Sequence, residues 1–356
     1  MQADKINDCL HYNAMANIQQ RRVARAMKAG GPDVIRVDTE DLAPLQADEV
    51  LVRVEAIGLN HVETLARSGQ YAVAFPFPYA LGFEGSGRVV AVGARVTIPV
   101  DARVCWTAVF GSCATHVVAR AALLARVPDE VTLDDAATLA HAAITAEGLA
   151  RHWPLAPGAF AVVWGAAGAV GRLLVSRLAD RGVHVIGIAS GDRTDVVRAV
   201  GAARAVDRLC EDIGAVVREA TGGCGVAAVF DPIGAATYDT SIGLLAPRGC
   251  LVNYGQLDGA LPPIDLAPLM EAGSVFVTKY GPRAGLLRQE ELAPIIVSTL
   301  LRARRQPLSA GVAARFSLDS VVDAYRAMDA GARGKVLVLP GPSMSSGVNM
   351  SRNRLG

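Results

Sequence analysis

The stretch Ala161-Val-Val-Trp-Gly-Ala-Ala-Gly-Ala-Val-Gly-Arg172 decides the fold class of this chain. Residues 161–164 are apolar without alternation, which is typical of a parallel strand covered on both faces. Gly165 and Gly168 allow a tight turn, and Gly171 lets a following helix pack closely on the strand. The pattern predicts a strand, a glycine turn and a helix whose N-terminal N–H groups bind a pyrophosphate.

The flanking sequence agrees with this interpretation. Residues 172–181 have the pattern of a helix, Gly182 is a typical helix stop, and residues 183–189 form a second apolar strand. This order is that of a βαβ unit and indicates a dinucleotide site, although Ala166 holds the first glycine position of the usual motif. The alternative is an ordinary strand–helix junction whose glycines serve packing alone. The turn residues that we predict to contact the cofactor are Ala167, Gly168, Ala169 and Val170.

The composition excludes several classes of protein. The 356 residues are enough for two domains, and 51% hydrophobic against 19% charged residues exclude a disordered chain. A formal net charge of +1 gives no electrostatic reason to expect binding to nucleic acid or to a membrane surface. The six cysteines are scattered without a C-x-x-C pair, which favours reduced thiols in a cytoplasmic protein over a zinc site or a disulfide framework.

The sequence contains no recognisable targeting or membrane segment. Residues 1–20 are polar and lack the apolar core of a secretory signal. The longest uncharged run, residues 153–171, contains two prolines and four glycines, so we do not expect it to cross a membrane as a helix. Residues 1–21 and 342–356 are expected to be flexible tails.

Two kinds of pattern divide the chain. The first third is predicted to be β-rich, with strands at 23–28, 49–56 and 87–92. After a predicted helix at 134–150, strands and helices alternate as in a doubly wound parallel sheet. Beyond residue 189 the expected strands are 202–206, 227–230, 250–254 and 274–278, and the expected helices are 194–200, 211–221 and 238–245.

The last part of the chain, residues 288–340, is predicted to contain two helices and a final strand at 335–339. We expect it to return to the first domain and to make that domain discontinuous. The predicted domains are therefore residues 22–141 with 283–341, and residues 142–282.

Seven short stretches occur in a specific order and spacing: Gly58-Leu-Asn-His-Val-Glu-Thr64, Arg67-Ser-Gly-Gln-Tyr71, Leu81-Gly-Phe-Glu-Gly-Ser-Gly87, Ala166-Ala-Gly-Ala-Val-Gly171, Thr221-Gly-Gly-Cys-Gly-Val226, Phe230-Asp-Pro-Ile-Gly234 and Pro247-Arg-Gly249. With them the chain resembles the zinc-free medium-chain reductases of the quinone oxidoreductase (zeta-crystallin-like) family. The resemblance implies an α/β fold, a Rossmann doubly wound parallel sheet plus a discontinuous β-rich, GroES-like catalytic domain. Ala169 departs from the family pattern, which has glycine there.

The resemblance also implies that catalysis does not use a metal. Zinc-dependent alcohol dehydrogenases of this superfamily have a Cys and a His where this chain has Asn60 and Phe83, neither of which is a strong zinc ligand. The four-cysteine lobe that binds a structural zinc in those enzymes is missing as well. We therefore expect no metal site.

Ser190 indicates which nicotinamide cofactor is bound. NAD enzymes have an Asp or Glu at this strand end, where it binds the ribose 2′-OH, whereas Ser190 can donate to a 2′-phosphate. The resemblance implies that Arg193 and Arg208 contact the same phosphate, so NADPH is the predicted cofactor. In the alternative, Asp192 binds the ribose of NADH and Arg193 is an ordinary solvated residue.

The resemblance implies two candidate catalytic residues. Asn60 would face the nicotinamide and bind its ribose or the substrate, and the Tyr71 phenol would donate to an oxyanion. Tyr71 is alternatively only part of the wall of the substrate cleft. His61, beside Asn60, is either an acid or substrate ligand, or a surface or packed histidine.

Further candidates come from the cofactor domain. By resemblance Thr145 lies near the nicotinamide, and the alternative is a helix residue bound to its own backbone. Asn253, Tyr254 and Gly255 end a predicted strand whose carboxyl end should face the cofactor. Weaker candidates, which are alternatively solvated charges, are Lys279 and Lys335.

The aromatic residues Phe75, Phe77 and Tyr79 lie in a proline-rich loop, which either stacks on a flat acceptor or clamps the two domains together. The predicted function is an NADPH-dependent reductase of a quinone or α,β-unsaturated carbonyl. The alternatives are an enoyl-thioester reductase and a non-catalytic NADPH-binding protein. A homodimer is expected, paired through residues 274–278.

Overall fold

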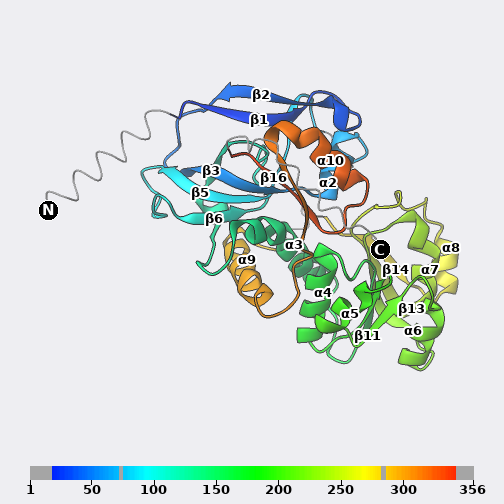
Figure 1. Ribbon diagram of the computed structural model, residues 1–356. Coiled ribbons are helices and arrows are strands. Elements are labelled where there is room, and N and C mark those ends of the chain that lie inside the picture. Colours follow the sequence, from blue (N-terminus) through cyan, green and yellow to red (C-terminus); the bar gives the residue numbers. More distant parts are fainter. Residues whose placement is uncertain (1–17, 72–74, 282–285, 342–356) are drawn as a thin grey trace, which may run out of the picture.

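Three β-sheets organise the chain in the computed structural model, which describes residues 18–71, 75–281 and 286–341. The middle of the chain forms a six-stranded parallel sheet. Strands of the first third form a three-stranded sheet, and further strands of the first third join the last two strands in a seven-stranded sheet. In Figure 1 the parallel sheet and its helices lie at the lower right and the other two sheets lie above. The predicted α/β architecture, a doubly wound parallel sheet joined to a β-rich part, is confirmed.

The parallel sheet has the strand order β11-β10-β9-β12-β13-β14. The order reverses between β9 and β12, and doubly wound sheets bind their ligands at the carboxyl ends of the strands at such a point. The glycine turn follows β9, so it stands at this position. The strands are β9 (Phe160–Val163), β10 (His184–Ala189), β11 (Arg204–Asp207), β12 (Val226–Asp231), β13 (Leu245–Asn253) and β14 (Phe276–Lys279).

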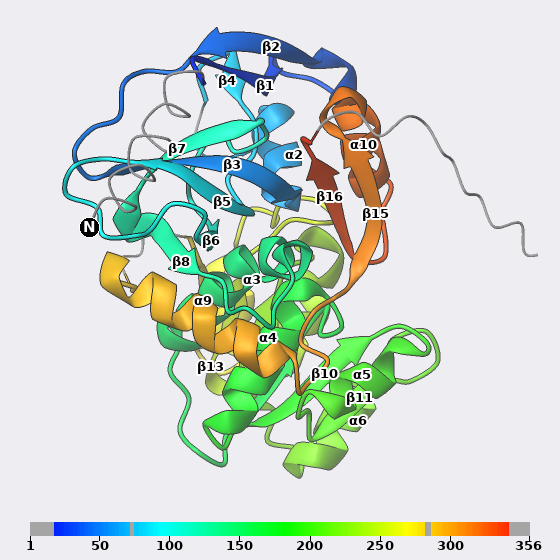
Figure 2. The same cartoon turned by 60° about the vertical axis from the view of Figure 1, so that its left-hand side comes forward.

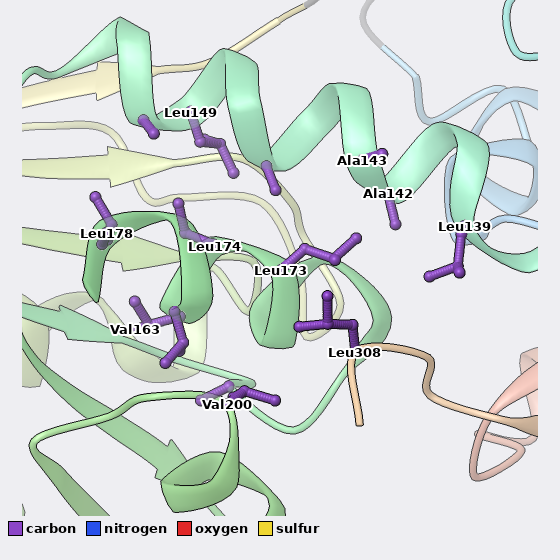
Figure 3. Packing of buried hydrophobic residues seen from close by; sticks show 14 of the residues in the cluster. Leu139, Ala142, Ala143, Leu149, Val163, Leu173, Leu174, Leu178, Val200 and Leu308 are labelled. Carbon is purple, nitrogen blue, oxygen red and sulfur yellow. The ribbon is translucent and has the colours of Figure 1, made fainter. Parts of the chain in front are cut away.

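Helices cover both faces of this sheet because the side chains around β9 are apolar on both. Val163 belongs to the core under α3 and α4, whereas Val162 belongs to the core on the opposite face. Figure 3 shows the first core, with Leu149 of α3 and Leu174 of α4 among the packed side chains. The helices of this part are α3 (Leu133–His152), α4 (Ala169–Asp180), α5 (Arg193–Ala199), α6 (Ile213–Thr221), α7 (Tyr238–Gly243) and α8 (Leu266–Glu271).

The glycine turn has the geometry that the sequence predicts. Gly165 has a φ of +61°, which favours glycine. A Cβ on Gly171 would lie 2.2 Å from Gly165 O, so only glycine lets α4 pack this closely on the turn. α4 begins at Ala169, three residues before the predicted start, and the N–H groups of its first turn have no partner within the helix.

The N-terminal and C-terminal parts of the chain share the seven-stranded sheet. β16 pairs antiparallel with β3, and β15 pairs parallel with β16, so the last segment returns to the first part, as Figure 2 shows. Helices α2 (His61–Arg67), α9 (Gln289–Ala303) and α10 (Val321–Asp329) accompany these sheets. The strands are β1 (Gln20–Ala26), β2 (Ile35–Asp41), β3 (Glu49–Gly58), β4 (Tyr79–Ala80), β5 (Gly85–Val92), β6 (Arg103–Trp106), β7 (His116–Arg120), β8 (Leu124–Arg126), β15 (Val312–Ser317) and β16 (Lys335–Leu339).

Some local expectations differ from the structure. Residues 20–21 belong to β1 and not to the predicted N-terminal tail. β15 was not predicted, because its exposed and half-buried residues alternate without an apolar face. The expected tail residues 1–17 and 342–356 and the boundary at 282–283 lie outside the described residues, so the domain limits stay predictions. Among the described helices, none combines the length and apolarity needed to cross a membrane.

Candidate active site

A buried ion pair lies where the two parts of the chain meet. Lys335, at the start of β16, is 7% exposed, and Glu84, just before β5, is fully buried. Lys335 Nζ donates to Glu84 Oε2 at 2.7 Å, to Leu59 O at 3.1 Å and to Asn60 Oδ1 at 2.5 Å. Its three N–H groups are thus all used within the protein. The structure therefore shows Lys335 holding Asn60 and Glu84, and its predicted contact with the cofactor stays a prediction.

These contacts define what the Asn60 side chain can do. Because an ammonium group only donates, the oxygen of the Asn60 amide must face Lys335. The amide nitrogen donates to Gly58 O at 3.0 Å and to Glu84 Oε2 at 2.8 Å, which uses both of its hydrogens. Asn60 therefore has no hydrogen left to donate, and a ribose or substrate hydroxyl can contact its side chain only at the Oδ1 acceptor.

Helix α3 packs against the same cluster. A Cβ on Gly58 would lie 2.1 Å from Ala137 O, so this glycine lets the end of β3 approach α3. Glu84 Oε1 accepts a hydrogen bond of 2.6 Å from the backbone N–H of His141. One carboxylate thus joins the segment before β5, the start of β16 and α3.

His141 lies between two threonine hydroxyls. Its Nδ1 is 3.3 Å from Thr107 Oγ1, and its Nε2 is 3.4 Å from Thr145 Oγ1. The ring also packs edge-on against Phe83, with the ring centroids 4.8 Å apart. Burial lowers the pKa of His141 to about 4, so the imidazole is neutral at pH 7. Sequence reasoning did not single out this residue.

The donor set of this region does not fit a zinc ion. Phe83 offers no ligand atom, and the Glu84 carboxylate is already bound by the Lys335 ammonium group. Across residues 18–71, 75–281 and 286–341, no three His, Cys, Asp or Glu side chains are grouped to hold a metal. We derive no catalytic step through a metal.

A basic group surrounds Ser190 at the carboxyl ends of β10 and β11. Arg208 Nε donates to Ser190 Oγ at 2.8 Å, and Arg193 begins α5 three residues further on. Burial and the nearby charge of Arg193 lower the pKa of Arg172, so a third arginine lies close. Asp207 accepts hydrogen bonds from two backbone N–H groups of this loop, and these lower the pKa of its carboxyl.

The predicted residues Asn253, Tyr254 and Gly255 lie at the carboxyl end of β13, at the same edge of the parallel sheet as Ser190. Lys279 Nζ donates to Asn253 Oδ1 at 2.7 Å, and Asn253 Nδ2 donates to Asp231 O at 3.2 Å. Burial lowers the pKa of Lys279 and raises that of Tyr254. A Cβ on Gly255 would lie 2.3 Å from Pro232 O, so close packing against Pro232 by itself requires glycine at this position.

Aromatic rings connect Tyr71 to His141. Ring centroids are 6.3 Å apart for Tyr71 and Phe75, 6.1 Å for Phe75 and Phe110, and 6.4 Å for Phe110 and Phe83. We call Tyr71, Phe75, Phe110 and Phe83 the aromatic row; it ends at His141. Tyr79 packs on Phe75 at 5.0 Å and on Phe77 at 5.2 Å. Phe110, which is 67% exposed, is the residue of this row that sequence reasoning missed.

His61 lies apart from this arrangement. Its half-buried ring has a pKa lowered by burial, and the charge that opposes this shift is Asp329 on α10. Asp329 in turn accepts hydrogen bonds from Thr64 and Arg67 on α2. The structure therefore relates His61 to the packing of α2 on α10.

Comparison with known proteins shows the family to which the chain belongs. The chain is 35% identical over 255 residues to a quinone oxidoreductase of Pseudomonas aeruginosa, covering 70% of this chain and 78% of that protein. The chain belongs to the quinone oxidoreductase family of medium-chain dehydrogenases/reductases. Family models described as "Alcohol dehydrogenase GroES-like domain" and "Zinc-binding dehydrogenase" match residues 46–129 and 169–289.

The chain is also similar to two further proteins. The chain is 32% identical over 262 residues to a 2-haloacrylate reductase of a Burkholderia species, covering 71% of this chain and 78% of that protein. A mycobacterial protein solved in complex with NADPH is 33% identical and superposes with a TM-score of 0.79, over 90% of this chain and all of that one.

In this member of the quinone oxidoreductase family, some side chains of the candidate site are neighbours that no local sequence pattern indicates. Glu84 lies inside a stretch that carries the resemblance, but its partner Lys335 is 251 positions away. Thr107 and His141 are separated by 34 positions. The first pair depends on the pairing of β16 with β3 and of β3 with β5 in the seven-stranded sheet, and the second depends on the packing of α3 against β6.

We predict that Lys335→Met lowers the free energy of unfolding by about 3–5 kcal/mol, because it leaves the buried Glu84 carboxylate without a counter-charge. Urea unfolding measures this change. The control is the double variant Lys335→Met with Glu84→Gln, which buries no charge and should regain most of the loss. Equal losses in the single and double variants would contradict the assignment.

Proposed function

We propose that this protein is an NADPH-dependent reductase that transfers hydride to a quinone or an α,β-unsaturated carbonyl without a metal. The observation that carries the acceptor class is the aromatic row, whose last ring, Phe83, packs on His141, the neighbour of Thr145. Aromatic rings favour stacking with other flat π-systems. Similarity to a quinone oxidoreductase and to a 2-haloacrylate reductase supports the same classes.

The basic group at Ser190 supports NADPH over NADH. A 2′-phosphate carries negative charge, and arginine guanidinium groups are its strongest protein partners. Arg208 already holds Ser190, and Arg193 stands at the N-terminus of α5 beside it. The free N–H groups of Ala169 and Val170 at the start of α4 suit the pyrophosphate. A relative of the same family binds NADPH, which agrees with this choice.

When bound, NADPH supplies the hydride. The protein's own groups must bind both partners and stabilise the charge that develops on the acceptor. Asn60 accepts a hydroxyl hydrogen through its Oδ1, as its fixed amide requires. Tyr71 stands at one end of the aromatic row, with its phenol as a donor for the acceptor or with its ring as part of the wall.

The experiment that tests the activity follows NADPH consumption with quinones, enones, enoyl thioesters and simple aldehydes, with NADH in parallel. We expect turnover with quinones or enones and a preference for NADPH. Turnover confined to enoyl thioesters would replace the proposed acceptor by the thioester alternative. Binding of NADPH without turnover of any acceptor would favour a non-catalytic binding protein.

We predict that Arg193→Ala weakens NADPH binding by about 10- to 100-fold and changes NADH binding little, since one charge-assisted contact to the 2′-phosphate is lost. Dissociation constants from nicotinamide fluorescence measure this. Arg198→Ala is the matched control, because Arg198 lies on the same helix and pairs with Asp195. Equal losses for both cofactors would rule out the 2′-phosphate contact and revive NADH binding through Asp192.

We further propose a homodimer that pairs through β14, in a protein of the cytoplasm. β14 is an edge strand of the parallel sheet, and Phe276 on it is 43% exposed. Leu266 and Met270 on the neighbouring α8 are 75% and 67% exposed. An unpaired edge strand beside apolar side chains favours pairing with a second copy. The five described cysteines are free thiols, which suits a reducing compartment.

We predict that Phe276→Asp converts the dimer into monomers, because it buries a charge in the paired edge. Light scattering during size-exclusion chromatography should give twice 37.1 kDa for the wild type and 37.1 kDa for the variant. Leu301→Asp, at a residue with 41% exposure on α9, is the control and should stay dimeric. A monomeric wild type would refute the pairing.

A further inference from the structure

Thr107, His141 and Thr145 form a row of polar groups that the proposed function does not yet use. Thr107 follows β6 and is 5% exposed, whereas Thr145 is only partly buried on α3. The imidazole of His141 lies between the two hydroxyls, at 3.3 and 3.4 Å. Both distances are long for hydrogen bonds, as is common in sites that close around a ligand.

The direction of these hydrogen bonds follows from burial. The Thr107 hydroxyl has His141 as its only side-chain or backbone partner within the described residues, so its buried hydrogen must be donated to Nδ1. A neutral imidazole that accepts at Nδ1 carries its hydrogen on Nε2. In this tautomer Nε2–H donates to Thr145 Oγ1, which leaves the hydrogen of the Thr145 hydroxyl available to a group outside this row.

The surroundings of His141 keep the ring neutral and fixed. The nearest charges, Glu84 and Lys335, are paired with each other at 2.7 Å. Burial lowers the pKa of His141 to about 4, which removes the form with hydrogens on both nitrogens at pH 7. The ring cannot turn freely, because Phe83 packs edge-on against it and its backbone N–H is bound to Glu84.

We propose that Thr107, His141 and Thr145 form an oriented donor chain in which the Thr145 hydroxyl donates to the oxygen of the hydride acceptor. His141 and Thr107 are positioning residues, and Thr145 is the residue that touches the substrate. The ligand that we assign to Thr145 is the hydride acceptor, because His141 packs on Phe83, the last ring of the aromatic row on which the acceptor would stack. This inference rests on the proposed reductase function. The chain stabilises negative charge on the acceptor oxygen and gives up no proton, since the final proton comes from water.

The test compares Thr145→Val, Thr107→Val and the double variant with the wild type, using the acceptor that the wild type reduces best. Valine keeps the shape of threonine and removes the hydroxyl. We expect Thr145→Val to lower kcat by about 100-fold, as for the loss of one donor to an oxyanion. Thr107→Val should lower kcat by about 3- to 10-fold, since it removes one neutral hydrogen bond. NADPH dissociation constants should stay within about twofold.

The double variant separates positioning from general packing. If Thr107 acts only through Thr145, Thr107→Val has no further effect once Thr145 is valine, whereas independent structural effects add. Thr145→Ser keeps the hydroxyl and should retain activity. Thr138→Val is the matched control on α3, because the Thr138 hydroxyl is bound to Asp135 O at 2.8 Å, away from this row.

Each outcome has a definite meaning. Unchanged kcat in Thr145→Val, with normal thermal unfolding, refutes the donor chain and leaves the reductase function intact. Weaker NADPH binding with unchanged kcat also refutes it, because the hydroxyl would then bind the cofactor. A wild type that binds NADPH but reduces no acceptor overturns the proposed function, and the donor chain with it.

Discussion

The buried ion pair between Glu84 and Lys335 holds together segments that are far apart in the chain. A buried charge is stable only when it is paired and hydrogen-bonded, so β16 must return to β3 to neutralise Glu84. The same two side chains hold the Asn60 amide and the N–H of His141. The arrangement of the β-rich part, the orientation of Asn60 and the placement of α3 therefore depend on one interaction.

Helix α3 carries this arrangement over to the parallel sheet. Its apolar residues, Leu139 and Leu149 among them, belong to the core that it shares with α4, as Figure 3 shows. Its polar residues His141 and Thr145 lie beside the aromatic row and Glu84. Because a long helix is rigid, it fixes the distance between the acceptor side and the cofactor side of the site.

The arrangement of the glycine turn and the basic residues was predictable from the sequence, whereas the way in which Phe110 and Phe83 extend the aromatic residues to His141 was not. The glycine turn, Ser190, Arg193 and Arg208 follow strand ends, and the ends of parallel strands meet at one edge wherever the sheet forms. The aromatic row, in contrast, joins loops and strand ends that pairing between distant segments brings together. No pattern around a single lysine at a strand start reveals its partner, so the contact of Lys335 with Glu84 could not be predicted.

The sequence by itself determined the doubly wound sheet, the glycine turn after β9 and the basic residues around Ser190. These depend on short runs of residues whose spacing matches one local geometry, such as Gly165 with Gly171. Only the tertiary structure decided that Lys335 is an internal counter-charge, that Asn60 can only accept a hydrogen bond, and that His141 bridges two threonines. These roles come from burial and from contacts between residues distant in the chain, and both exist only once the chain has folded and these segments have packed together.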